Sequence, residues 1–102
     1  MPSTQSSPYF VKDPASVRDF AVDWSDWLLL KTGVTLSSVA VTAGAGITVD
    51  SSSVDGNQGI ARLSGGTIGA AYDVAFAGTF SNGEIDVQHI IITINEIPIG
   101  LP

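Results

Sequence analysis

The sequence contains no cysteine, a single histidine and only four basic residues against ten acidic ones, which gives a formal net charge of −6. Without cysteine, neither a disulfide framework nor a thiolate metal site can form. Nucleic-acid binding needs a stripe of cations that neutralises phosphates. The cations present are too few to form one: Lys12, Arg18, Lys31 and Arg62. We therefore expect no nucleic-acid partner.

Long hydrophobic runs are also missing. The apolar run at residues 90–92 is far too short to cross a bilayer, which takes about 20 apolar residues. Residues 1–7 lack the charged region followed by an apolar run that marks a secretory signal peptide. We expect a protein that is made in the cytoplasm and has no membrane partner.

Groups that could carry out catalysis are scarce. A Ser-His-Asp triad would have to use His89, which falls within a predicted strand. The stretch Leu63-Ser64-Gly65-Gly66 lacks the preceding glycine of the turn that exposes a nucleophilic serine. A zinc site around His89 would need carboxylates alone as its other ligands. We predict no enzyme activity and no catalytic residue.

Calcium is the other candidate metal, because the loops of β-sandwiches sometimes supply its oxygen ligands and this chain is rich in acidic residues. The aspartates concerned are Asp19, Asp23, Asp26, Asp50 and Asp55. Their spacing does not match the dense pattern of a calcium-binding loop, so solvated faces and turn caps are the preferred interpretation. We predict no metal and no cofactor, and a calcium-stabilised adhesin repeat stays the weakest alternative.

Glycine and apolar residues are abundant, with 11 glycines and 44% apolar residues in a chain of 102. This is the composition of one compact, β-rich domain. Short alternating segments are separated by turn signals about every eight to twelve residues. The pattern predicts an all-β fold, an immunoglobulin- or fibronectin-III-like β-sandwich of six to seven short antiparallel strands.

The alternation of apolar residues assigns the strands and their faces: Ile90, Ile92 and Ile94 share one face of the last strand, and Ala61 and Leu63 point inward. Trp24 shares an apolar face with Phe20 and is therefore predicted to lie in the core. Ser25 is expected to cap a helical turn that carries Trp27, and a bulge is possible at Ser37-Ser38. Predicted strands cover residues 19–24, 34–43, 47–49, 58–63, 72–80 and 85–94, with a polar loop at residues 50–57.

Two local motifs define the end of the domain. Gly69 lies three residues before Tyr72, as in the tyrosine corner of β-sandwiches, where the phenol hydroxyl bonds back to the upstream backbone. Asn82-Gly83 lies between two alternating runs and predicts a hairpin with a type I′ turn, which needs positive φ at both residues. We take Gly69, Tyr72, Asn82, Gly83 and the core Trp24 as structural residues.

Three segments are predicted along the chain: a flexible N-terminal arm at residues 1–11, the sandwich at residues 12–95 and an apolar tail at residues 96–102. The patch Tyr9, Phe10 and Val11 has two open interpretations, an edge strand of the domain or an arm that adds to a neighbouring subunit. Trp27 is a candidate interface anchor, since tryptophan is enriched at interface hot spots. The candidate contact residues are Tyr9, Phe10, Val11, Trp27, Ile97, Ile99 and Leu101.

A family resemblance rests on several blocks in a fixed order. They are Lys12-Asp13-Pro14, the stretch from Asp19 through Val22-Asp23-Trp24-Ser25-Asp26-Trp27-Leu28, Leu63-Ser64-Gly65-Gly66-Thr67, Gly69, Tyr72 and Ser81-Asn82-Gly83. The sequence resembles small virion proteins of tailed bacteriophages, of the immunoglobulin-like fibre–tail adaptor or neck/tail accessory type. The resemblance implies a non-enzymatic structural protein of the virion that contacts portal, adaptor, tail or fibre proteins in multiple copies, as in a symmetric ring.

An alternative from the binding class remains open. A small sandwich could instead decorate the capsid or recognise carbohydrate on the host surface. Trp24 and Trp27 could form an aromatic platform for a sugar, although core packing is the better interpretation of Trp24.

Overall fold

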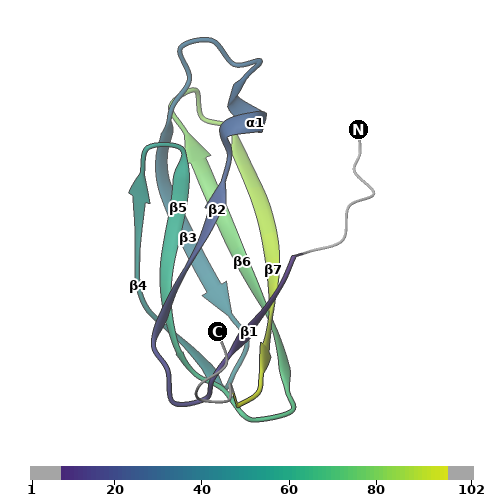
Figure 1. The fold of residues 1–102 in the computed structure, drawn as a ribbon. Coiled ribbons are helices and arrows are strands. Elements are labelled where there is room, and N and C mark those ends of the chain that lie inside the picture. The colour runs from purple at the N-terminus through teal and green to yellow at the C-terminus, as the bar shows by residue number, and fades with distance from the viewer. Residues whose placement is uncertain (1–7, 97–102) are drawn as a thin grey trace.

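The computed structural model describes residues 8–96. In this part of the chain the protein is all-β apart from one short helix, as the sequence predicts (Figure 1). The elements are β1 (Tyr9–Lys12), β2 (Arg18–Asp23), α1 (Ser25–Leu28), β3 (Leu36–Ala43), β4 (Ile47–Asp55), β5 (Gln58–Gly65), β6 (Ala71–Phe80) and β7 (Ile85–Ile94).

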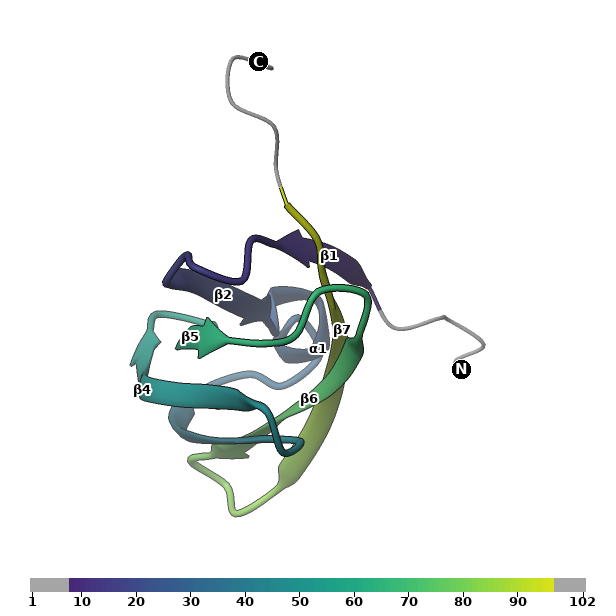
Figure 2. The same cartoon turned by 90° about the horizontal axis from the view of Figure 1, so that it is seen from below.

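The strands form two sheets that face each other, as the view from below shows (Figure 2). One sheet has the order β1-β7-β6-β3 and the other the order β2-β5-β4. All pairs are antiparallel except β1 with β7, which is parallel. The expectation of antiparallel strands throughout is therefore wrong for β1. A turn at Asp13 leads β1 into β2 of the opposite sheet, so no hairpin dictates the direction of β1.

The core lies between the sheets and follows the predicted alternation. Ile90, Ile92 and Ile94 of β7 are at most 2% exposed, and Ala61 and Leu63 of β5 are fully buried. Trp24 is 2% exposed, and its indole N–H donates to Asp86 at 2.8 Å, so the ring is buried with its polar atom satisfied.

The β6–β7 hairpin forms where it was predicted but with a different turn. Gly83 has a φ of +92°, and within residues 8–96 no residue other than glycine has a positive φ, so Asn82 does not adopt the conformation that a type I′ turn requires. The Gly83 N–H donates to the Phe80 carbonyl, and the Phe80 N–H donates to the Glu84 carbonyl. This is the three-residue loop that ends in a left-handed glycine.

Two other local predictions need correction. The polar loop expected at residues 50–57 is largely strand, because β4 continues to Asp55 and pairs with β5 as far as Gln58. Ser25 does not cap α1; its N–H and hydroxyl both donate to Asp23 Oδ1. The predicted bulge is confirmed, since the β3–β6 register shifts between Leu36 and Ser38.

The corner at Tyr72 links the two sheets. The Thr67 N–H donates to the Tyr72 hydroxyl at 3.0 Å, which is the bond to the upstream backbone that the motif requires. Hydrogen bonds from the side chain and then the N–H of Thr67 lower the pKa of Tyr72, because a hydrogen bond donated to the hydroxyl oxygen favours the phenolate. The ring lies against Gly46, where an added Cβ would come within 3.1 Å of it. Gly69 has a φ of +87°, and its N–H donates to the carbonyl of Ile94.

Candidate protein-contact surfaces

The described residues offer contact surfaces rather than a cluster of reactive groups. No group of three or more His, Asp or Glu side chains within residues 8–96 is placed to hold a metal ion. His89 is exposed on β7, and its Nδ1 lies 2.9 Å from Asp73 Oδ2. The one helix in the described part, α1, is too short to cross a membrane.

The patch Tyr9, Phe10 and Val11 belongs to β1, so the edge-strand interpretation describes its place in the isolated chain. Tyr9 is 71% exposed and Val11 51% exposed, and both point away from the core. Phe10 points inward and packs edge-on against Phe20 of the opposite sheet, with ring centroids 5.5 Å apart. The strand therefore holds two apolar side chains in water on a fixed backbone.

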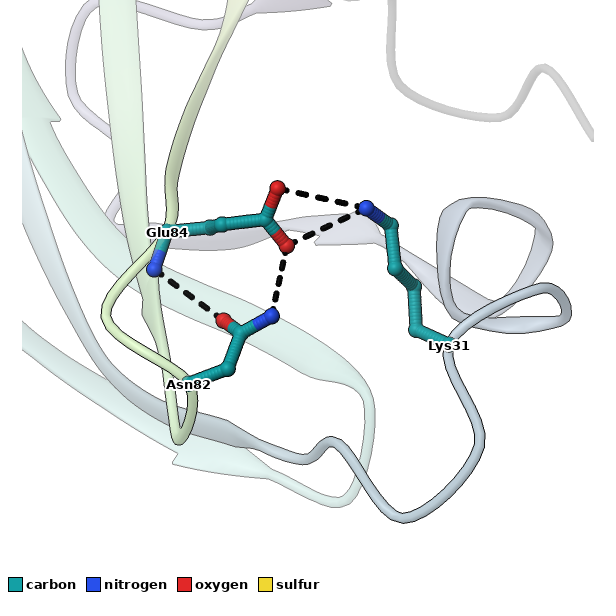
Figure 3. Close-up of polar contacts among 3 residues, drawn as sticks. All are labelled: Lys31, Asn82 and Glu84. Atoms are coloured by element: carbon teal, nitrogen blue, oxygen red, sulfur yellow. Dashed lines mark hydrogen bonds and ion pairs between the residues drawn. The ribbon is translucent and has the colours of Figure 1, made fainter.

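Trp27 is half-buried at one end of the sandwich. Its ring stacks on Phe80 at 4.2 Å, and the Lys31 ammonium lies 4.7 Å from its centroid. Figure 3 shows how this lysine is held: Nζ reaches both carboxylate oxygens of Glu84, at 3.1 and 3.2 Å. Because Trp24 is buried and Trp27 is already in contact with a ring and a cation, the two tryptophans do not form a shared exposed platform.

The same network involves one of the turn residues predicted as structural. The Asn82 amide donates to Glu84 Oε1, and Asn82 Oδ1 accepts from the Glu84 N–H at 3.0 Å (Figure 3). These bonds, from Asn82 first and from Lys31 next, lower the pKa of Glu84. The side chain of Asn82 thus fixes the loop and the carboxylate that holds Lys31.

Sequence reasoning missed two features near the ends of the sandwich. Leu29 and Leu30 follow α1 and are 75% and 92% exposed. Lys12 is fully buried, and its ammonium donates to the carbonyls of Asp13 and Gly65, at 2.9 and 2.8 Å. Burial lowers the pKa of Lys12, because the charged form loses its hydration. Nothing in the sequence distinguishes this lysine from a solvated one.

The outer faces of the two sheets differ in charge. We call the outward residues of β1, β7, β6 and β3 the neutral face. On β7 these are Ile85, Val87, His89, Ile91 and Thr93, since the intervening residues 90, 92 and 94 are buried. Their neighbours on β6 and β3 are small: Ala75, Ala77, Thr79, Ser38, Ala40 and Thr42. Asp73 is the only acid on this face among the described residues, and it contacts the only base, His89.

We call the outward residues of β2, β5 and β4 the acidic face. Arg62 of β5 forms a bidentate ion pair with Asp19 of β2: Nε lies 2.8 Å from Oδ1, and Nη2 lies 3.3 Å from Oδ2. This bond lowers the pKa of Asp19. The face also carries Asp23, Asp50 and Asp55, with serines between them on β4. A surface of this kind is well solvated and gains little by burial.

Not every predicted contact residue can be placed. Tyr9 and Val11 lie on the neutral face, whereas Trp27 lies at the end of the sandwich that carries α1. Ile97, Ile99 and Leu101 lie outside the described residues.

Together, the fold and its surfaces define a small all-β protein that is suited to binding other proteins. A family model described as "Podophage GP4 fiber-tail adaptor protein gp77" matches residues 12–93, and the chain belongs to this family. Membership implies a structural, non-enzymatic role in the virion, where the chain binds other virion proteins such as tail and fibre. No curated protein matches the chain.

Proposed function

We propose that the chain is an immunoglobulin-like adaptor at the neck or tail of a virion, where it joins tail and fibre components in several copies arranged as a ring. The observation that carries this proposal is the family match over residues 12–93. The topology supports the immunoglobulin-like part. If the strands are lettered in sequence order, β2-β5-β4 becomes B-E-D and β7-β6-β3 becomes G-F-C, which are the sheet orders of that fold.

The contact elements of this proposal are β1, Trp27 and the segment at residues 97–102. Tyr9 and Val11 expose apolar area on the neutral face, and Trp27 exposes part of its ring at one end. Chains that carry a net charge of −6 repel one another. Contacts through a face with one acid and one base avoid most of this repulsion, and cyclic closure repeats such a contact around a ring.

Cross-linking in assembled particles tests the proposal, and the absence of cysteine makes the design clean. Cysteine is introduced at Thr42 on the neutral face or at Ser53 on the acidic face, both exposed. Each variant then carries one photoreactive label. We expect links from position 42 to a tail, portal or fibre protein and few from position 53. Links only to the major capsid protein would indicate capsid decoration, and absence of the chain from pure particles would contradict a virion role.

Substitution is a better test of β1 than deletion. Removal of residues 1–11 would destroy the β1–β7 pairing, so loss of assembly could reflect loss of the fold. The double variant Tyr9→Ser, Val11→Ser keeps the strand and removes only its exposed apolar side chains. We expect reduced incorporation with an unchanged melting temperature. A chain that lacks residues 97–102 retains every described strand and tests the contacts assigned to Ile97, Ile99 and Leu101.

A further inference from the structure

The edge of β7 is only partly covered. On one side, β7 pairs with β6 from Ile85 onward. On the other side, β1 pairs with it only at residues 91–94. Within residues 8–96, no strand therefore lies beside residues 85–90 on that second side. Such an edge is a template for pairing with another chain.

The hydrogen bonds show which backbone groups face this gap. The N–H of Ile94 donates toward β6, to Ala70, whereas the N–H of Ile91 donates to Pro8 on the β1 side. Because the direction alternates along a strand, the N–H and C=O groups of Ile85, Val87 and His89 also point away from β6. The gap thus presents a row of donors and acceptors at the spacing of an extended chain.

Pro8, the residue directly before β1, lacks a donor that the ladder with β7 would use. Pro8 O accepts from the Ile91 N–H, and Lys12 O accepts from the Asn95 N–H, which fixes the register of the parallel ladder. In that register, the N–H of residue 8 would be the donor to the carbonyl of His89. Proline has no N–H, so residue 8 cannot make this bond to the His89 carbonyl.

The side chains around the gap also favour pairing with an added strand over protection of the edge. Natural edges are commonly blocked by lysine, proline or an inward-pointing charge; residues 85–90 contain neither lysine nor proline, and their one carboxylate, Asp86, is engaged by the indole N–H of Trp24. Ile85 is 64% exposed and Val87 46% exposed, and the residues opposite them on β6 are Thr79 and Ala77. An added strand with apolar residues at alternate positions would pack beside them.

We propose that residues 85–90 of β7 accept an extended segment of a neighbouring virion protein as an added strand. This inference rests on the proposed adaptor function and names the kind of partner that the neutral face takes. The segment has apolar side chains at alternate positions and no proline where it faces Val87. Main-chain hydrogen bonds supply the affinity, and the alternate side chains supply the specificity.

Val87→Pro tests the proposal most directly. The N–H that it removes points into the gap, so the pairing with β6 is retained. Val87→Thr is the matched control, because it keeps the N–H and the branched side chain. We expect Val87→Pro to lower incorporation into particles by about tenfold or more, the effect of one or two lost interface hydrogen bonds, and Val87→Thr to incorporate normally. Normal incorporation of Val87→Pro would overturn the proposal.

Hydrogen exchange of the unmodified chain gives a second readout that does not depend on how a variant folds. Amides at residues 85–89 that face the gap should exchange rapidly in the free protein and slowly in particles. Protection already present in the free monomer would show that the chain covers its own edge and would overturn the proposal. If the free protein forms a dimer and Val87→Pro dissociates it, the edge binds a second copy of this chain. That result would also overturn the proposal. The cross-links from position 42 report the adaptor role separately, so the two ideas can fail independently.

Discussion

The two outer faces of this sandwich are built on the same alternation of strand residues, yet they present different chemistry. The acidic face carries four aspartates and an arginine that pairs with one of them. The neutral face carries alanine, threonine, valine and isoleucine, with Asp73 and His89 in mutual contact as its only acid and base among the described residues.

In the proposed adaptor, this difference would let a strongly acidic protein bind its neighbours closely. Burial of an unpaired carboxylate carries a large desolvation penalty, so a face with several of them stays in water. A face of small and apolar side chains loses little on desolvation and gains from the area it buries. The negative charge of the chain is therefore confined largely to surfaces away from the neutral face.

A matched pair of substitutions tests this division with the largest expected effect. Ala40 of β3 and Ala21 of β2 are both exposed alanines on edge strands, one on each face. Ala40→Lys places a cation in the proposed contact and should lower incorporation into particles by about tenfold or more, since an unpaired charge would be buried. Ala21→Lys should have no effect on incorporation. Equal behaviour of the two variants would abolish the distinction between the faces.

Much of this division could be predicted from sequence, because burial of one side of a strand places apolar residues at every second position. Ile90, Ile92 and Ile94 were assigned to one face on that basis, and so were Ala61 and Leu63. The assignment of the inner face fixes the outer one. What alternation does not reveal is which strands become neighbours, and hence that the alanines of β6 and β3 lie side by side.

The failures have equally local causes. The serines of β4 carry little hydrophobic signal, so pairing with β5 decides that they are strand. The parallel direction of β1 and the uncovered part of β7 are set by contacts between residues about 80 positions apart, as in the pair Tyr9 and Ile91. The burial of Lys12 is hidden for the same reason, since its acceptor Gly65 belongs to another sheet.

Lys12 offers the next largest effect, because it fastens the strand that displays Tyr9 and Val11 to the opposite sheet. Lys12→Met leaves the carbonyls of Asp13 and Gly65 without their donor and should lower the free energy of unfolding by about 1–3 kcal/mol. Lys31→Met is the control, since Lys31 is partly exposed and its pair with Glu84 lies at the surface. Urea denaturation measures both, and equal midpoints would contradict a fastening role for Lys12.

The smallest effect is expected on the acidic face. The ion pair with Arg62 lowers the pKa of Asp19 in the folded protein below its usual value of about 3.9, so the pair stabilises the fold above that pH. This contribution is lost as the pH falls through the lowered pKa. Arg62→Gln should therefore cause a small decrease in the urea midpoint at pH 7 and none in strong acid, where Asp19 is protonated in both proteins. Because the pair is exposed on a face that stays in water, incorporation into particles should not change. A loss of incorporation in Arg62→Gln without a matching loss of stability would place a contact on the acidic face as well.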